Sequence, residues 1–252
     1  MNIKRSLQFT LIATALLLAP TAMAADIIVS AAASLGNAFG DIAKDFEKAN
    51  PGTRVLLNLG ASGQLLQQIS RGAPAHVFAS ADQETMDRAE KQRLVAPESR
   101  VNFVSNQLVL IVSSDAAAAP GSLADLDKAD VKRIGIGTPE SVPAGRYAKQ
   151  GLEIAGLWDK LKDKYVYGQN VRQVLDYVAR GEVDAGFVYA SDAELLKDRV
   201  KAAATVPTKA PIIYPIAAVK GSGDEKRALQ FIAYVRSEAA AKVLAKYGFQ
   251  NP

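Results

Sequence analysis

Two serines stand where a predicted strand gives way to a predicted helix. Ser34 lies in AAASL at 31–35, and Ser62 lies in NLGASGQ at 58–64. A helix N-terminus carries unpaired backbone N–H groups and a partial positive charge. A serine placed there adds a hydroxyl donor, so the two turns together predict a site for an oxyanion. The alternative is that each serine is an ordinary N-cap, whose hydroxyl accepts from its own helix.

Three positions in the second half of the chain offer donors of the same kind. In VPAG, Pro143 has no N–H, so Ala144 is the first backbone donor of that turn. Val171 opens the next predicted helix, and Tyr189 ends an apolar strand with a phenolic O–H. For Tyr189 the alternative is a core tyrosine whose hydroxyl is paired locally.

A site built from these groups contains donors and no charged side chain. It suits an anion that is fully deprotonated at neutral pH, such as sulfate, molybdate or tungstate. Hydrogen phosphate brings a proton that needs an acceptor, so a site of donors alone rejects it. Arg146 and Arg172 stand close to the proposed donors. Each either clamps the anion directly or pairs with a nearby acid.

Catalytic and metal sites are poorly supported by the sequence. GASGQ at 60–64 approaches a nucleophile elbow but lacks its second glycine, and His76 is the sole histidine. A triad of Ser62, His76 and Asp82 would run in an order foreign to that fold. One histidine and no cysteine exclude the common zinc spacings. We therefore predict a binding protein and not an enzyme, with an exported hydrolase as the alternative.

The mature sequence alternates strand-like and helix-like segments, which is typical of an α/β fold with parallel strands and helical crossovers. Apolar residues at i, i+3 and i+4 identify the helices, and short β-branched runs identify the strands. The predicted strands are 26–30, 54–59, 76–80, 107–113, 133–137, 164–167, 183–189 and 212–220. The predicted helices are 35–46, 64–70, 82–91, 147–155, 171–179 and one closing helix over 224–247.

Two long apolar strands, 107–113 and 212–219, separate the α/β series into two groups. This pattern predicts two lobes joined by two crossings, and the alternative is a single continuous sheet. The predicted first lobe comprises 25–106 and 217–252, and the second comprises 107–216.

Residues 1–24 are predicted to be a signal peptide. Lys4 and Arg5 form its basic start, an apolar run over 7–19 follows, and 22–24 match a small-residue cleavage site. The run is too short to span a bilayer. The chain has no cysteine and hence no disulfide or thiol for lipid attachment. An exported and unanchored protein stays near its cell behind a second membrane, which predicts a periplasmic location.

Charge gives no support for a nucleic-acid partner. The 252 residues include 30 Lys and Arg against 26 Asp and Glu, and two of the basic residues lie in the predicted signal peptide. No basic run interleaves with aromatic residues.

Several strings, taken in order, resemble a known family. They are AAASL, GASGQL, GAPAHVFASADQ, GTPESVPAGRYAKQ, NVRQVL, GFVYASDA and KYGF. Together they span the mature chain and resemble the bacterial periplasmic molybdate-binding proteins, the solute receptors of molybdate ABC importers. The resemblance implies a two-lobed periplasmic binding fold, with each lobe a mostly parallel sheet flanked by helices and with two hinge crossings.

The resemblance also implies the ligand and its contacts. Molybdate, and tungstate of nearly the same size, would bind between the lobes as an oxyanion, with no protein atom bonded to the metal and no cofactor. A cavity that fits molybdate would leave the smaller sulfate ion with fewer contacts. The partner would be an inner-membrane ABC permease, and the receptor would be a monomer. The implied ligand residues are Ser34, Ser62, Ala144, Val171 and Tyr189.

Overall fold

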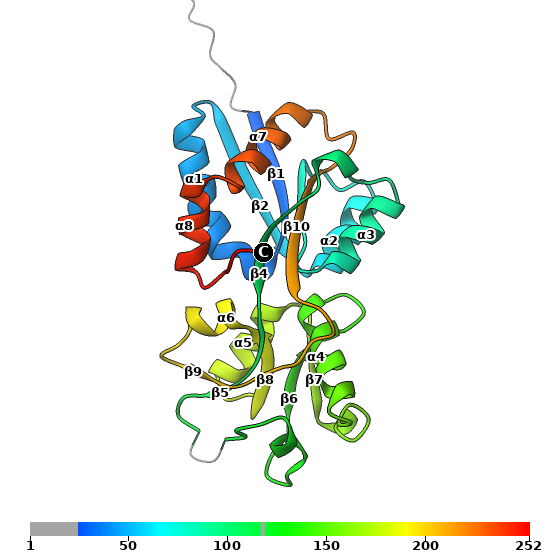
Figure 1. Cartoon of the computed structure of the whole chain (residues 1–252), viewed down its shortest axis with the longest axis vertical. Coiled ribbons are helices and arrows are strands. Elements are labelled where there is room, and N and C mark those ends of the chain that lie inside the picture. Colours follow the sequence, from blue (N-terminus) through cyan, green and yellow to red (C-terminus); the bar gives the residue numbers. More distant parts are fainter. Residues whose placement is uncertain (1–24, 117–118) are drawn as a thin grey trace, which may run out of the picture.

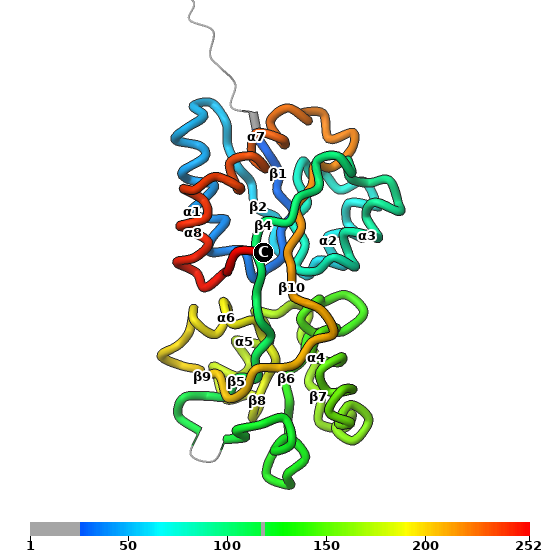
Figure 2. Tube along the Cα trace, in the orientation of Figure 1, coloured from blue at the N-terminus to red at the C-terminus, as the bar shows by residue number. Residues whose placement is uncertain are grey.

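The computed structural model describes residues 25–116 and 119–252, and the predicted signal peptide lies outside them. Each of two lobes contains one five-stranded sheet (Figure 1). The chain passes from the first lobe to the second at Gln107 and returns through 206–211, as the trace in Figure 2 shows. The single continuous sheet is therefore wrong, and the predicted two-lobed fold is confirmed.

The first lobe has a mixed sheet. The strand order is β2 (Thr53–Gly60), β1 (Ala25–Ala32), β3 (Val77–Ala79), β10 (Ile212–Ala218) and β4 (Val101–Asn106). The first three strands are parallel, and β10 is antiparallel to both of its neighbours. The helices are α1 (Gly36–Ala49), α2 (Ser62–Ser70), α3 (Gln83–Lys91), α7 (Glu225–Val235) and α8 (Glu238–Lys246).

Helices cover both faces of this sheet, because strand side chains alternate between the faces. In β3, Val77 belongs to the core shared with α1 and α7, and the adjacent Phe78 packs among the residues of α2 and α3. Phe39 and Phe46 of α1 are both fully buried and lie against Phe231 of α7. Their spacing of almost two helical turns places them on the single apolar stripe that the sequence predicts.

The second lobe repeats this plan. The strand order is β7 (Tyr165–Gly168), β6 (Ile134–Gly137), β8 (Ala185–Tyr189), β5 (Leu108–Ser113) and β9 (Val200–Thr205). The first three strands are parallel, and β5 is antiparallel to β8 and to β9. The helices of this lobe are α4 (Pro143–Ile154), α5 (Val171–Ala179) and α6 (Ala190–Leu195). Short 3-10 turns occur in both lobes: η1 (Ala33–Leu35), η2 (Pro97–Ser99), η3 (Ala124–Asp127) and η4 (Lys162–Lys164).

Two predicted boundaries require correction. The predicted limit between lobes at 216 falls inside β10, a strand that belongs wholly to the first sheet, so the crossing lies at 206–211. The single closing helix over 224–247 is wrong, because the chain forms α7 and α8. Ser237 separates them by capping α8, its hydroxyl accepting from the N–H of Ala240.

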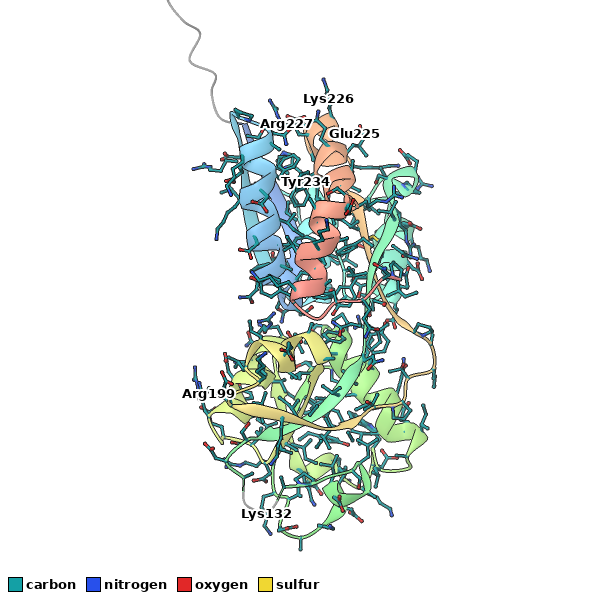
Figure 3. All side chains as sticks on the ribbon, turned by 60° about the vertical axis from the view of Figure 1, so that its left-hand side comes forward. Lys132, Arg199, Glu225, Lys226, Arg227 and Tyr234 are labelled. Atoms are coloured by element: carbon teal, nitrogen blue, oxygen red, sulfur yellow. The ribbon has the colours of Figure 1, made fainter. Side chains whose placement is uncertain are left out.

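Charged side chains project from the outer ends of the molecule. Figure 3 shows Glu225, Lys226 and Arg227 of α7 at the far end of the first lobe and Lys132 at the opposite end of the second. These charges are solvated and lie away from the contact between lobes. None of the helices within the described residues is long and apolar enough to cross a membrane.

Candidate functional site

Sheet register brings the predicted donors to the facing edges of the two lobes. In the first lobe Ala32 pairs with Gly60, so the turns bearing Ser34 and Ser62 leave neighbouring parallel strands at one edge. In the second lobe Gly137 pairs with Gly168, and the segments leading to α4 and α5 leave their strands in the same way. Ligands of open α/β sheets bind at such carboxyl edges.

A small cavity lies between the two edges. All five predicted ligand positions line it, together with residues such as Ala81 and Asn170, and the five are Ser34, Ser62, Ala144, Val171 and Tyr189. The volume open to the centre of a water-sized sphere is about 10 Å³, which is room for about one such particle. The space between the two lobes is thus of a size suited to a single small ion.

Neither serine caps its own helix. The N-cap positions of η1, α1 and α2 make no side-chain cap hydrogen bond. The Ser62 hydroxyl oxygen accepts from the N–H of Ala81, 3.0 Å away, and the Ser34 hydroxyl lies 3.1 Å from that of Tyr214. Both serines are buried, with at most 2% of the residue exposed. The N-cap alternative is therefore wrong for both.

Ala144 occupies the second position of α4, directly after Pro143. The backbone N–H groups of a first helical turn have no partner within the helix, so the N–H of Ala144 is available to a ligand. Gly145 allows this turn to pack onto the end of β6, since a Cβ there would lie 1.9 Å from the carbonyl oxygen of Gly137. The glycine thereby sets the depth of the Ala144 donor in the cleft.

Val171 is the first residue of α5. The N-cap of this helix is Asn170, whose side-chain oxygen accepts from the N–H of Gln173 at 3.1 Å. The cap uses the third backbone donor of the helix and leaves the first, at Val171, beside the cavity.

Tyr189 reaches across the cleft. Its side chain is buried, and its hydroxyl donates to the carbonyl oxygen of Ala81 in the first lobe at 3.4 Å. Tyr189 thus belongs to the buried core, as the alternative expected, but the partner of its hydroxyl lies in the other lobe and is not local. Burial raises the pKa of the Tyr189 phenol well above its usual range. The hydroxyl consequently keeps its proton at neutral pH and remains a donor.

Arg146 pairs with the opposite lobe and does not line the cavity. Its Nε and Nη2 contact Oδ2 of Asp82 at 3.0 and 2.5 Å, and Nη2 also donates to Thr85 Oγ1 at 2.7 Å. Burial on its own lowers the pKa of Arg146, but the attraction of Asp82 outweighs burial and raises it. The guanidinium is a bridge between lobes, which corresponds to the second of the two roles that the sequence left open.

Arg172 also bridges the lobes outside the cavity lining. Its two terminal nitrogens donate to the carbonyl oxygen of Ser34 and to the side chain of Asn37, at 2.9 and 3.0 Å. Its Nε lies 2.6 Å from Asp192 Oδ1 as an ion pair that lacks hydrogen-bond geometry. Burial raises the pKa of Asp192, and the charge of Arg172 opposes this effect. Asp192 also accepts from the N–H of Tyr189 at 3.2 Å, so the pair supports two cavity residues.

The predicted alternative of a serine hydrolase is wrong. Ser62 Oγ is bonded to the N–H of Ala81, and His76 Nδ1 accepts from the N–H of Ile28 at 2.9 Å, so the two side chains form no pair. Within 25–116 and 119–252, no cluster of three or more His, Cys, Asp or Glu side chains is placed to hold a metal ion.

Three features of the site escaped the sequence analysis. The N–H and the carbonyl oxygen of Ala81 bond to Ser62 and Tyr189, which line the cavity. The hydroxyl of Tyr214 contacts that of Ser34. The N–H of Gly63 donates across the cleft to the carbonyl oxygen of Ser141 at 3.0 Å. ASADQ at 79–83 follows a strand and precedes a helix, so the signal used for Ser34 and Ser62 also identifies Ala81. Tyr214 lies inside a plain apolar strand and carries no such signal.

Comparison with known proteins supports the resemblance seen in the sequence. The profile of the bacterial extracellular solute-binding proteins matches residues 27–250. The molybdate-binding protein ModA of Haemophilus influenzae is 37% identical over 251 residues, with 96% of this chain and 98% of that protein covered. YvgL of Bacillus subtilis, named as a candidate ABC transporter substrate-binding lipoprotein, is 42% identical, with 88% and 85% covered.

A solved structure agrees with these relatives. The periplasmic molybdate-binding protein of Azotobacter vinelandii superposes with a TM-score of 0.77 at 26% identity, covering 90% of this chain and 99% of that one. The profile match extends over both lobes and includes every residue of the interlobe cavity. The chain is a solute receptor and not an enzyme, and it belongs to the family of bacterial extracellular solute-binding proteins.

Proposed function

We propose that this chain is the periplasmic receptor of an ABC importer and that it binds molybdate between its lobes. The observation that carries the proposal is the cavity itself, which is small, lies between the lobes and contains neutral donor groups from both of them. The proposed ligands are the hydroxyl groups of Ser34 and Ser62, the backbone N–H groups of Ala144 and Val171, and the hydroxyl of Tyr189, whose proton would turn from the Ala81 carbonyl to the anion. No protein atom would bond to molybdenum.

The size of the cavity favours a compact inorganic ion. Room for about one water-sized particle is too little for an organic solute such as a vitamin or a sugar phosphate. The names of the Haemophilus and Azotobacter relatives point to molybdate within that class. Tungstate has the same charge and nearly the same size, so we propose that it binds with similar affinity.

Charge in the site also favours a dianion without protons. The two nearby guanidinium groups are occupied by Asp82 and Asp192, so the ligand is stabilised by dipoles and not by a direct cation. Hydrogen bonds to a charged acceptor are stronger than neutral ones, each contributing about 1.5–3 kcal/mol. Five such donors suffice for tight binding without a cation, and hydrogen phosphate would lack a partner for its proton.

Closure of the lobes would complete the donor shell, because neither lobe carries all five groups. The closed receptor, acting as a monomer, would then dock on an inner-membrane permease. Export to the periplasm would follow from residues 1–24, whose composition matches a signal peptide.

The test is calorimetric titration of the mature protein with molybdate, tungstate, sulfate and phosphate. We expect tight binding of the first two, weaker binding of sulfate and none of phosphate. Tight binding of sulfate with weak binding of molybdate would assign the site to sulfate instead. Absence of binding for all four anions would remove the proposed function.

A further inference from the structure

A hydrogen-bonded chain runs from the first crossing to the cavity. The N–H of Gln107 donates to Asn106 Oδ1 at 2.9 Å. Asn106 Nδ2 donates to Ser191 Oγ at 2.8 Å and approaches the hydroxyl of Tyr214 at 3.5 Å. The Tyr214 hydroxyl in turn lies 3.1 Å from Ser34 Oγ, which lines the cavity. The side chains of this chain are all buried.

The direction of these bonds follows from the first donor. A backbone N–H can only donate, so the amide atom beside Gln107 is the oxygen, and the other amide atom of Asn106 is the NH₂ group. The NH₂ group can only donate, so the Tyr214 oxygen receives it as an acceptor. The proton of Tyr214 must then go elsewhere.

Ser34 is the remaining partner for that proton. Among the described residues, the Tyr214 hydroxyl has hydrogen-bond neighbours only in Asn106 and Ser34, and Tyr214 is fully buried. A buried hydroxyl proton without an acceptor is costly, so Tyr214 donates to Ser34 Oγ. The proton of Ser34 cannot then point to Tyr214, and it is left for the cavity.

Ser62 is oriented in the same sense by a different group. Its Oγ accepts from the N–H of Ala81 at 3.0 Å, and a backbone N–H cannot accept in return. The proton of Ser62 is therefore also left for the cavity. Each hydroxyl thus has one lone pair occupied by a protein donor and a proton that points to the cavity, so both serines present a donor to the ligand.

We propose that Tyr214 and Asn106 are positioning residues that fix Ser34 as a hydrogen-bond donor and so select an oxyanion that has no proton to give. The inference rests on the proposed function and adds a cause for its selectivity. Ser34, Asn106 and Tyr214 all belong to the first lobe, so the donor is oriented before the lobes close. This preorganisation contributes to affinity because the hydroxyl need not reorient when the ligand arrives.

The first test is a double-mutant cycle with Tyr214→Phe and Ser34→Ala, measured by calorimetry with molybdate. Phenylalanine keeps the ring contacts of Tyr214 with Tyr189 and Phe249 and removes only the hydroxyl. We expect Tyr214→Phe to weaken molybdate binding about tenfold in the parent and less than about twofold in the Ser34→Ala background. Equal effects in both backgrounds would show that Tyr214 does not act through Ser34, and would overturn the inference.

Selectivity gives a second readout, which a merely structural role would not change. In Tyr214→Phe the Ser34 hydroxyl can turn and accept, so the ratio of phosphate to molybdate dissociation constants should fall. The matched control is Tyr247→Phe, which removes a tyrosine hydroxyl bonded to Asp41 in the same lobe at 2.8 Å. This control variant should bind both anions with the same dissociation constants as the parent. An unchanged ratio in Tyr214→Phe would count against the inference.

Asn106→Asp covers the case in which Tyr214→Phe fails to fold. A carboxylate only accepts, so it would turn the Tyr214 proton away from Ser34, and Ser34 would donate to Tyr214 instead of the ligand. In this background Ser34→Ala should cost less than about twofold in molybdate affinity, whatever the added charge does to binding. A cost equal to that in the parent would overturn the inference. Molybdate binding by the parent separates either outcome from failure of the proposed function.

Discussion

Arg146 of α4 and Asp82 at the start of α3 form an ion pair between the lobes, with Nη2 and Oδ2 2.5 Å apart and only 12% and 4% of the side chains exposed. The Asp82 carboxylate also accepts hydrogen bonds from the Ser80 hydroxyl and from the N–H of Thr85. Through the second of these bonds Asp82 caps the N-terminus of α3. The pair therefore stabilises the closed arrangement of the lobes. The positive charge of Arg146 is neutralised by the carboxylate of Asp82 and does not contact the ligand.

Arg146→Met should weaken molybdate binding without altering any group of the cavity lining. The substitution leaves Asp82 buried without its partner, which penalises the closed form by about 1–3 kcal/mol, or roughly five- to 150-fold in apparent affinity. Titration calorimetry measures the loss of affinity. Without ligand, small-angle X-ray scattering should show a larger radius of gyration for the variant than for the parent. Arg180→Met is the control, since Arg180 pairs loosely with Glu182 at 3.9 Å on the surface. Parent-like affinity in Arg146→Met would contradict a role in closure.

Each of the three hydroxyl donors should contribute measurably to affinity. Ser34→Ala, Ser62→Ala and Tyr189→Phe each delete one bond to a charged acceptor, which costs about 1.5–3 kcal/mol. Calorimetry with molybdate measures the change. Ser70→Ala, which removes an exposed hydroxyl bonded to the Gln67 carbonyl, is the control and should bind as the parent does. If all three cavity variants bind molybdate normally, the ligand lies elsewhere.

Gly63→Ala should hold the lobes apart. A Cβ at this position would lie 2.7 Å from the Ser141 carbonyl oxygen of the opposite lobe, and the N–H of Gly63 donates to that same oxygen. We expect affinity for molybdate to fall about tenfold or more, because closure is obstructed while the donors remain. Gly40→Ala is the control. Nothing lies within 4 Å of a Cβ built there, so it should stabilise α1 by about 0.5–1 kcal/mol and leave binding unchanged. Normal binding by Gly63→Ala would mean that the close approach is not needed.

Binding of molybdate should be independent of pH over the neutral range. Histidine and carboxylate side chains are absent from the cavity lining within the described residues, and burial raises the pKa of Tyr189. A tyrosine with a raised pKa keeps its proton at and beyond the usual value of about 10, so affinity should be flat from about pH 6 to 9. Affinity should fall only above about pH 10, where a phenolate would repel the anion. A loss between pH 6 and 8 in calorimetric titrations would require a titrating group at the site.

Local patterns of the sequence were sufficient to predict most of the elements and the candidate donors. The i, i+3, i+4 repeat of apolar residues from Leu35 to Phe46 identifies α1, and strand-to-helix turns identify Ser34 and Ser62. These features depend on residues close together in the chain. The parallel pairing of Ala32 with Gly60 then brings the two turns to one edge.

Features that depend on distant residues could not be predicted. Tyr214 and Ser34 are 180 positions apart, and nothing in the strand IIYPIAA marks its tyrosine as polar in function. The partners of Arg146 and Arg172 lie in the opposite lobe, so the sequence left their roles open. The lobe boundary was misplaced for a similar reason, since pairing of β10 with β3 and β4 is a property of the folded sheet.

The confined volume between the lobes has a consequence for how the anion travels. With space for about one water-sized particle, the ion cannot carry its hydration shell into the site and must exchange each bound water for a protein donor. Release of the ion to the proposed permease would require the reverse exchange. Opening of the cleft, by readmitting solvent to the ion, would supply the water that draws it away.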